Sequence, residues 1–268
     1  MVNMMVLFIF SGDFLKWKKI GDILIVDNKF DEDSADSLES IASGHKVKSI
    51  IKVTKIDGQK REPTIELLYG EETETVHKEN GCLFNLDLSK VMWAKGNNNE
   101  RLRIAKLVNE GETVVDMFAG IGYFSIPIGV HSKAKEIYSI EINPNSHHFL
   151  RNNIELNRIN EKAGYDRMIP ILGDCAIEAP KYSADRVLMG YVKTTHHFLK
   201  PAMECVKDGG IIHYHETVPL KLIETRPYER MKKAAWECGE REVEVLNIQN
   251  IKRYAPGVEH VVLDARIY

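Results

Sequence analysis

The segment 113–124 combines residue types suited to holding a charged cofactor. Its apolar start reads as a strand that runs into Asp116, and a small-residue turn with Gly120 and Gly122 follows before a helix. In parallel sheets such a turn cradles a ligand. A carboxylate at the strand tip repels a pyrophosphate but suits a ligand with an ammonium group and a cationic sulfur. We therefore expect S-adenosylmethionine as the cofactor.

A nicotinamide dinucleotide is the alternative ligand, and a glycine-rich turn can also serve close packing alone. The dinucleotide fingerprint requires a third glycine, and this chain has Ser125 at that position. Glu141 ends the next predicted strand, at the distance where such a sheet presents a carboxylate to a ribose diol. Two features in register favour S-adenosylmethionine over NAD.

The end of the third predicted strand adds Asp174 and Cys175 to the candidate site. A side chain there lies where the adenine ring would sit, so Asp174 is a candidate acceptor for the exocyclic amine. By itself, Asp174 is explained equally well as a helix cap. The Cys175 side chain fits a small buried thiol, although its backbone is placed to touch the base. Asp116, Glu141 and Asp174 together favour a cofactor site.

The exit of the fourth predicted strand reads Gly190-Tyr191-Val192. Amino methyltransferases that act on adenine usually carry Asn-Pro-Pro-Tyr at this place, and the chain has neither the Asn nor the prolines. Methyl transfer of that kind is therefore disfavoured. Tyr191 is a weak candidate for a catalytic base.

A helix is predicted to begin next, at Thr194. Lys193 and Thr194 at its amino end suit the methionine carboxylate or an RNA phosphate, and simple capping by Thr194 is at least as good an explanation. His196 is a second weak candidate for a base, although a surface position explains it better.

Length and composition indicate a soluble protein with one large and one smaller domain. The chain has 268 residues with 44% apolar content, enough for a full core. The first ten residues are apolar but lack a basic leader and are too short to span a bilayer. We expect a strand or an ordered tail there, and no membrane contact.

Cysteine and histidine spacing argue against a metal site. His213, His215 and Glu216 have no third ligand at a suitable spacing. The four cysteines are scattered, which argues against zinc and against a disulfide framework, and they are Cys82, Cys175, Cys205 and Cys238. We expect no metal, and a reducing cytoplasm.

The net charge of −3 gives no overall attraction to nucleic acid, so any RNA contact must come from local basic clusters. Such clusters lie at 16–19, 46–55, 95–106 and 226–233. For any one of them, a solvated face is the more common explanation.

The order of predicted elements indicates an α/β fold. Residues 20–92 alternate short β-rich runs with polar turns, and from about residue 112 strands alternate with helices. Strands are predicted at 113–117, 136–140, 167–172, 185–190, 210–215, 242–249 and 259–266. Helices are predicted at 145–157, 194–206 and 228–238, and Gly209-Gly210 is expected to end the second of them. The last two strands leave no room for a helix and should form an antiparallel hairpin.

These elements predict a Rossmann-like, doubly wound sheet of the class I S-adenosylmethionine-dependent type with a C-terminal antiparallel hairpin. We divide the chain into an N-terminal tail or strand over 1–19, a small β-rich domain over 20–92, a connecting helix region over 93–111, and an S-adenosylmethionine-binding catalytic domain over 112–268.

Four segments resemble one tRNA-modifying family: 101–105, 116–124, 141–144 and 254–260. The family contains the archaeal and eukaryotic tRNA guanine-N1 methyltransferases that act beside the anticodon, together with their wybutosine-pathway relatives. The similarity covers about residues 20–268, and residues 20–92 match the small domain that precedes the catalytic domain in that family.

Two departures separate the chain from the methyltransferase branch. That branch typically has Asn-Leu-Pro or a similar run after the fourth strand, and it carries an extra N-terminal domain that we do not expect here. The resemblance therefore implies transfer of the 3-amino-3-carboxypropyl group of S-adenosylmethionine to C7 of 4-demethylwyosine in tRNA(Phe). A tRNA guanine-N1 methyltransferase and a non-catalytic RNA-binding protein are the alternatives.

The resemblance implies cofactor contacts from Arg101, Glu141 and Asp174. To these we add Asp116, Phe118, Gly120, Gly122, Ile142 and Cys175. The candidates for RNA contact are Lys95, Arg103, Lys193 and Thr194. We expect a monomer that acts in the cytoplasm on the anticodon region of tRNA(Phe).

Overall fold

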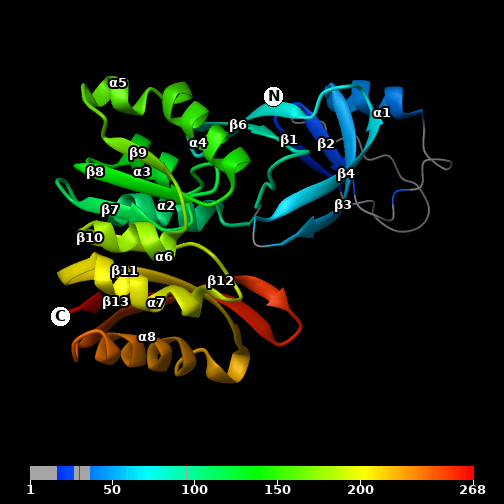
Figure 1. Cartoon of the computed structure of the whole chain (residues 1–268). Coiled ribbons are helices and arrows are strands. Elements are labelled where there is room, and N and C mark those ends of the chain that lie inside the picture. The colour runs from blue at the N-terminus through cyan, green and yellow to red at the C-terminus, as the bar shows by residue number, and fades with distance from the viewer. Residues whose placement is uncertain (1–16, 27–29, 31–36, 59, 95) are drawn as a thin grey trace, which may run out of the picture.

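The described residues of the chain form three sheets, of four, seven and two strands, arranged as in Figure 1. The computed structural model describes residues 17–26, 30, 37–58, 60–94 and 96–268. The strand or ordered tail expected over the first ten residues lies outside the described residues. The acidic segment 31–40 is expected to begin a short helix, and its residues 31–36 also lie outside the described residues. The division of the chain into domains at residues 19, 92 and 111 stays a prediction.

The four-stranded sheet forms the small N-terminal part. Its strands follow one another in space as β1 (Lys18–Ile20), β2 (Ile23–Val26), β3 (Ser49–Asp57) and β4 (Glu62–Tyr69). Only β2 and β3 are parallel, because the helix α1 (Leu38–His45) crosses between them. Ser37 caps this helix by accepting a hydrogen bond from the Ser40 amide at 3.3 Å.

The two-stranded hairpin is formed by β5 (Glu74–Glu79) and β6 (Cys82–Asp87). Two asparagines attach it to helix α4 (Pro144–Leu156), one within the helix and one at its C-cap. The Asn157 amide accepts from the Leu83 backbone N–H at 2.9 Å and donates to the Leu83 carbonyl at 2.7 Å. Asn153 makes the same pair of bonds with the backbone of Asn85. The two side-chain amides thereby hydrogen-bond to the backbone N–H and C=O groups at the edge of β6, as a neighbouring strand would.

The seven-stranded sheet has the order β12-β13-β11-β10-β7-β8-β9. Its members are β7 (Thr113–Asp116), β8 (Glu136–Glu141), β9 (Met168–Leu172), β10 (Ala184–Met189), β11 (Val206–Pro219), β12 (Val243–Ala255) and β13 (Val258–Ile267). The pairs from β11 to β9 are parallel, whereas β13 is antiparallel to both β11 and β12. The predicted doubly wound sheet and its C-terminal antiparallel hairpin are confirmed.

Helices cover both faces of this sheet. They are α2 (Asn98–Leu107), α3 (Ser125–His131), α4, α5 (Ile159–Ala163), α6 (Cys175–Glu178), α7 (Leu199–Cys205) and α8 (Arg226–Glu237), with short 3-10 turns η1 (Ala179–Lys181), η2 (Thr195–Phe198) and η3 (Leu220–Leu222). Adjacent β7 residues face opposite cores, since Val114 belongs to one buried cluster and Val115 to the other. The first cluster also holds Ile20 and Ile51, so the four-stranded sheet shares a core with the seven-stranded sheet.

One predicted helix end is wrong. The helix expected over 194–206 is present as the 3-10 turn η2 followed directly by α7, which together cover 195–205. Gly209-Gly210 does not end that helix but lies within β11, where Gly209 has φ 73°. The pairing jumps there from Ala184 with Val206 to Arg186 with Ile211, so the glycines form a bulge.

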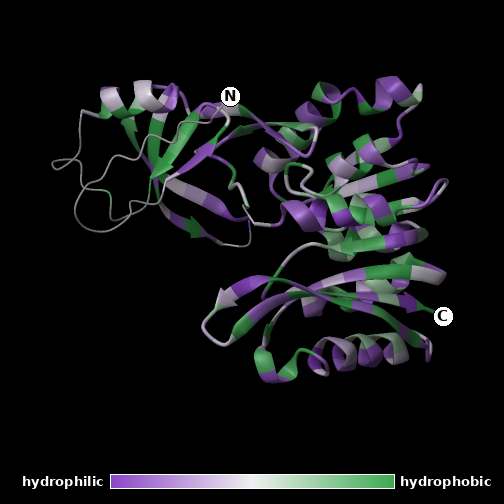
Figure 2. Cartoon of the chain, turned by 180° about the vertical axis from the view of Figure 1, so that it is seen from behind, coloured by the Kyte–Doolittle hydropathy of each residue, from purple (hydrophilic) through white to green (hydrophobic). Residues whose placement is uncertain are grey.

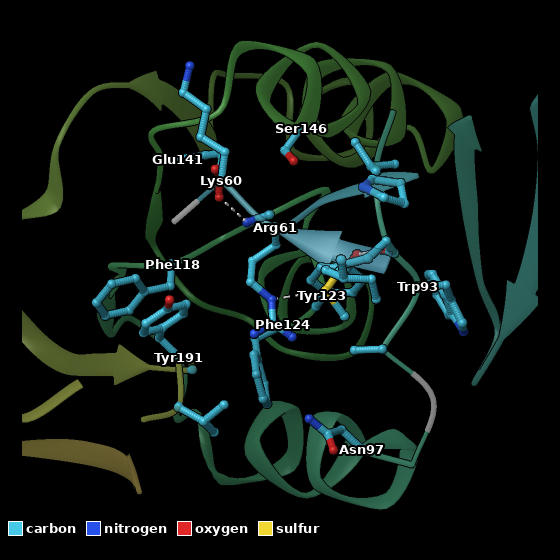
Figure 3. A pocket seen from close by; sticks show the side chains of 18 of the residues that line it. Lys60, Arg61, Trp93, Asn97, Phe118, Tyr123, Phe124, Glu141, Ser146 and Tyr191 are labelled. Carbon is cyan, nitrogen blue, oxygen red and sulfur yellow. Dashed lines mark hydrogen bonds between the residues drawn. The ribbon is translucent and has the colours of Figure 1, made fainter. Parts of the chain in front are cut away.

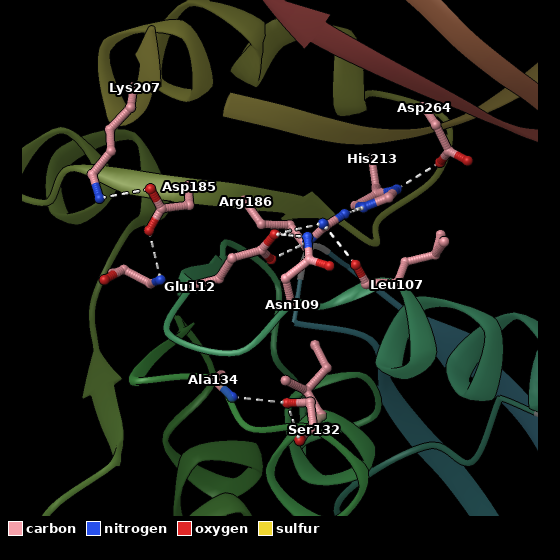
Figure 4. Close-up of polar contacts among 12 residues, drawn as sticks. Leu107, Asn109, Glu112, Ser132, Ala134, Asp185, Arg186, Lys207, His213 and Asp264 are labelled. Atoms are coloured by element: carbon pink, nitrogen blue, oxygen red, sulfur yellow. Dashed lines mark hydrogen bonds and ion pairs between the residues drawn. The ribbon is translucent and has the colours of Figure 1, made fainter. Parts of the chain in front are cut away.

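A chain of buried charges ties the strands of the sheet together (Figure 4). Arg186, only 2% exposed, donates to both oxygens of Glu112 at 2.7 and 3.0 Å and to Nε2 of His213 at 2.7 Å. The other nitrogen of His213 lies 2.5 Å from the Asp264 carboxylate, which also accepts from Arg103 at 2.6 Å. Burial lowers the pKa of His213, so a neutral imidazole donates from Nδ1 to Asp264.

Within the described residues no helix is long and apolar enough to cross a bilayer. All four cysteines are free thiols.

Replacement of Arg186 by leucine tests the buried charges. The R186L variant should lose about 3 kcal/mol of unfolding free energy, because Glu112 keeps its charge in a mostly buried position. The double variant R186L/E112L should recover much of that loss. The measurement is urea unfolding at about pH 7. The control K207M breaks a half-exposed pair with Asp185 and should cost less than about 1 kcal/mol. An R186L loss no larger than that of K207M would contradict the expectation.

Candidate functional site

A cavity of about 800 Å³ lies at the carboxyl ends of the parallel strands. In open sheets this is the edge that binds ligands. Residues that follow β7, β8, β9 and β10 line one side, and residues of the small domain and of the β12–β13 hairpin line the rest. Figure 3 shows Phe118, Tyr191 and Glu141 on one side of this space and Trp93 on the other, with Arg61 between them.

Asp116 holds the turn at the edge of the cavity in place from the side that faces the protein core. Its carboxylate accepts from the Ser125 hydroxyl at 2.7 Å and from the Phe118 amide at 3.2 Å, and the residue is completely buried. It is not among the residues that line the cavity. The structure therefore gives the expected direct contact of this carboxylate with an ammonium group no support, and that contact stays a prediction. Burial raises the pKa of Asp116 to about 6.

The two glycines of the turn have different roles. Gly120 lines the cavity with φ 58°, and a Cβ there would lie 2.5 Å from the Tyr123 ring. The backbone can therefore approach a ligand closely. Gly122 does not line the cavity, and a Cβ on it would clash with Ile126. Gly122 therefore packs the turn on α3, and its cofactor contact stays a prediction.

Glu141 connects the ends of two strands. Its Oε2 accepts from the Gly120 amide at 2.8 Å, and its Oε1 accepts from the Asn143 amide at 2.7 Å. Burial raises the pKa of Glu141, while these two amides favour the carboxylate. Each oxygen keeps a lone pair, so the group can still accept from a ligand diol. Ile142, the next residue, also lines the cavity.

Asp174 has one of the two roles that the sequence left open, the helix cap, and its contact with the cofactor stays a prediction. It is the N-cap of α6, accepting from the Ala176 amide at 2.9 Å, and it lines the cavity. Cys175 lines the cavity as well, but burial raises the pKa of its thiol to about 12. This neutral thiol is 5% exposed and packs against the core, as expected.

The exit of β10 provides an aromatic wall. Tyr191 stacks on Phe118 with ring centroids 5.3 Å apart, and Phe198 meets Phe118 edge-on at 5.1 Å. All three line the cavity, and so does Thr194. The stacked rings form an apolar surface on which a planar base can lie.

Two candidates from the same segment lie outside the cavity lining, Lys193 and His196. Lys193 is exposed, and burial is the main cause of the lowered pKa of His196. Nδ1 of His196 is buried, and no described residue hydrogen-bonds to it. The weak case for His196 as a catalytic base gains no support from this position.

Arg101 is held between two aromatic rings of the cavity wall. Its guanidinium carbon lies 4.8 Å from the Trp93 centroid and 4.9 Å from the Tyr123 centroid, and Nη1 donates to Glu79 at 2.6 Å. Arg103 is not in the cavity, because it pairs with acidic residues beside the sheet, so its predicted RNA contact has no support from its position. Lys95 lies outside the described residues.

Several lining residues were missed from the sequence. Trp93, Arg61 and Ser146 lack a recognisable motif, although Tyr123 falls within the glycine-turn segment. His260 reaches the cavity from β13 and lies 3.0 Å from His215 between ring nitrogens.

Burial lowers the pKa of His260 to about 4, so the His260–His215 pair is neutral near pH 7. The described residues contain no cluster of three or more groups that could hold a metal ion.

The G120A variant should weaken S-adenosylmethionine binding at least about tenfold, since the new methyl group strains a left-handed backbone and meets the Tyr123 ring. The measurement is calorimetric titration of the cofactor. G111A is the matched control, with φ 84° but open space around the Cβ position. Equal cofactor affinity in the two variants would show that the cofactor does not approach the backbone closely at Gly120.

The D116N variant tests the buried carboxyl. Folding raises its pKa from 3.8 to about 6, so its contribution to stability is present below pH 3.8 and lost as pH rises through about 6. The asparagine side chain does not ionise, so the D116N variant keeps its unfolding free energy over this pH range. Relative to the wild type, the unfolding free energy of D116N should rise by up to about 3 kcal/mol between pH about 4 and about 7. Urea unfolding across this range measures it. A constant difference between the two proteins would contradict an ionisable, buried Asp116.

Comparison with known proteins connects this geometry to a family. Residues 75–246 match the family model of the TRM5/TYW2 methyltransferase domain, and residues 14–73 match that of the TYW2 N-terminal domain. A Methanocaldococcus jannaschii protein named tRNA(Phe) (4-demethylwyosine(37)-C(7)) aminocarboxypropyltransferase is 49% identical over 94% of this chain and 98% of its own length. A Pyrococcus abyssi protein, tRNA (guanine(37)-N(1))-methyltransferase Trm5b, is 38% identical over 85% of this chain and 67% of its own length.

Solved structures agree with the sequence matches. The crystal structure of M. jannaschii TYW2 in complex with AdoMet has a TM-score of 0.76 at 43% identity, and covers 94% of this chain and 99% of that chain. The structure of P. horikoshii TYW2 in complex with MeSAdo has a TM-score of 0.81 at 42% identity, over 94% and 90% of the two chains. The chain described here belongs to the TRM5/TYW2 family.

Proposed function

We propose that this protein transfers the 3-amino-3-carboxypropyl group of S-adenosylmethionine to C7 of 4-demethylwyosine in tRNA(Phe), beside the anticodon. The single observation that carries the proposal is the likeness to aminocarboxypropyltransferases at 45–49% identity over 94% of the chain. A related structure that contains MeSAdo supports it further. MeSAdo, or methylthioadenosine, is what S-adenosylmethionine becomes when it loses that group.

The cavity fits S-adenosylmethionine. Glu141 is fixed by two backbone amides at a position that suits a ribose diol, and Asp174 lies at the end of the adjacent strand, where it suits the adenine amine. Gly120 lets the backbone approach the ligand, and Phe118 offers an aromatic face. Asp116 supports this set from behind the turn.

The cofactor supplies a carbon bound to a sulfonium, and nucleophilic attack on that carbon releases a neutral thioether. In the proposed transfer C7 of the base forms a bond to Cγ of the arm while the Cγ–S bond breaks and its electron pair stays on sulfur. The proton on C7 then leaves to solvent or to a weak base. Because the leaving group is good, the contribution of the protein is mainly positioning. Tyr191 and Phe118 would orient the planar base, and the small domain would exclude water.

The exit of β10 disfavours the methyltransferase alternative. Gly190 stands at the start of the run where that branch carries an amide side chain, and a Cβ there would lie 2.8 Å from the Phe124 ring. No side chain fits at that position without movement of this ring. A polar amide that orients a ring nitrogen for methyl transfer is therefore missing from this segment.

The RNA partner and the place of action belong to the same proposal. A solved complex of aTrm5 with tRNALeu, 31% identical and with a TM-score of 0.79, supports tRNA as the partner. We assign the reaction to the cytoplasm, where tRNA is available. The expected monomeric state is checked by light scattering.

Incubation with two labelled forms of the cofactor tests the proposal. Label at the carboxyl carbon should enter tRNA(Phe) isolated from cells that lack this protein, and label in the methyl group should appear in methylthioadenosine instead. Labelled methyl groups in the RNA would overturn the proposal in favour of methyl transfer. Absence of either label from the RNA with intact RNA binding would favour a non-catalytic role.

Substitution of Tyr191 separates stacking from proton transfer. The Y191F variant should keep activity within about threefold, because the ring alone supports the planar base, whereas Y191A should lose about tenfold or more. Single-turnover rates with saturating cofactor measure both. If Y191F lost as much activity as Y191A, the Tyr191 hydroxyl group would instead be the group that removes the C7 proton.

A further inference from the structure

We propose that Lys18, Arg101 and Lys252 form an anion site in the cavity wall that takes a backbone phosphate of the RNA substrate. The inference rests on the proposed function for the identity of the RNA. It concerns a binding site for one phosphodiester group, formed jointly by the small domain, the helix that follows it and the C-terminal hairpin.

The three cations converge from distant parts of the chain. Lys18 lies on β1, Arg101 on α2 and Lys252 on β12, and all three line the same cavity. Their proximity is also electrostatic: burial, followed by the charges of Arg101 and Lys18, lowers the pKa of Lys252. Like charges repel one another, so their convergence costs free energy that a bound anion would offset.

The balance of charge in the cavity favours a second, anionic ligand. Besides Lys252, four cationic side chains among the described residues line it, Lys18, Lys60, Arg61 and Arg101, against the two carboxylates of Glu141 and Asp174. Glu79 compensates one of the cations by pairing with Arg101. S-adenosylmethionine carries two positive groups and one carboxylate, so it adds positive charge and cannot neutralise the excess. An RNA phosphate brings the missing negative charge.

The position of the lysines suits a polymer that enters from outside. Lys18 is exposed and Lys252 is partly exposed, so solvent reaches both. The hairpin that carries Lys252 extends from the sheet on the side of the small domain in Figures 1 and 2, and in Figure 2 this extension carries both hydrophilic and hydrophobic residues. Its neighbouring residues on β12 include Asn250 and Arg253. The nucleotide chain can therefore follow the rim while its base enters the cavity.

His260 completes the site without adding charge. It lines the cavity beside the hairpin, and burial, followed by the charge of Lys252, lowers its pKa to about 4. A neutral imidazole can donate to a phosphate oxygen or accept from a ribose hydroxyl.

The test measures the binding of two ligands by the same variants. K18M, K252M and the double variant are titrated with a tRNA(Phe) transcript by fluorescence anisotropy, at salt concentrations from about 50 to about 200 mM. Each single variant should weaken RNA binding about three- to tenfold at the lowest salt. The slope of log K against log salt should fall by roughly 0.7 to 0.9 for the shared phosphate contact. S-adenosylmethionine affinity should stay within about twofold.

K133M is the matched control, because Lys133 is 76% exposed, pairs with Glu110 and does not line the cavity. RNA binding and salt slope equal to those of K133M would overturn the proposal. So would RNA binding that is intact in K18M and K252M while cofactor affinity falls, since the cations would then hold the methionine carboxylate. These titrations measure binding and need no turnover. A failed labelled-cofactor experiment would therefore overturn the proposed function without deciding whether the phosphate site exists.

Discussion

One carboxylate holds the candidate site together. Glu141 ends β8 and accepts hydrogen bonds from the Gly120 amide of the neighbouring turn and from the Asn143 amide that begins α4. The group thereby fixes the relative position of two strand ends and one helix start. Its burial, which raises its pKa, is tolerable only because these amides replace lost hydration. Any ligand that hydrogen-bonds to Glu141 therefore meets an oxygen that is already oriented.

Asp116 extends the same principle into the core. It is fully buried, and it fixes the turn through Ser125 and the Phe118 amide without touching the cavity. Of the three acids at this sheet edge, Asp116 shapes the backbone, whereas Glu141 and Asp174 face the cavity. This division explains how three carboxylates can crowd one sheet edge: each is compensated by backbone or hydroxyl donors.

The small domain completes the cavity and shares its core with the catalytic part. Ile20 and Ile51 pack in the same buried cluster as Val114 and Ile137 of the large sheet. The hairpin β5–β6 is held to α4 by the amides of Asn153 and Asn157. This shared packing limits relative movement of the two parts, so the cations of the small domain and of the C-terminal hairpin keep a defined spacing around the cavity.

The sequence by itself determined the sheet, the cofactor class and the acidic residues at the strand ends, because hydrophobic periodicity and turn chemistry are local properties. Only the tertiary structure decided which way those side chains face: Asp116 and Gly122 lie behind the turn, and Arg103 joins a buried charge network. It also brought Trp93, His260 and Lys252 to the cavity. Contacts between residues far apart in the chain depend on how the small domain and the final hairpin pack on the sheet, and no local pattern encodes that arrangement.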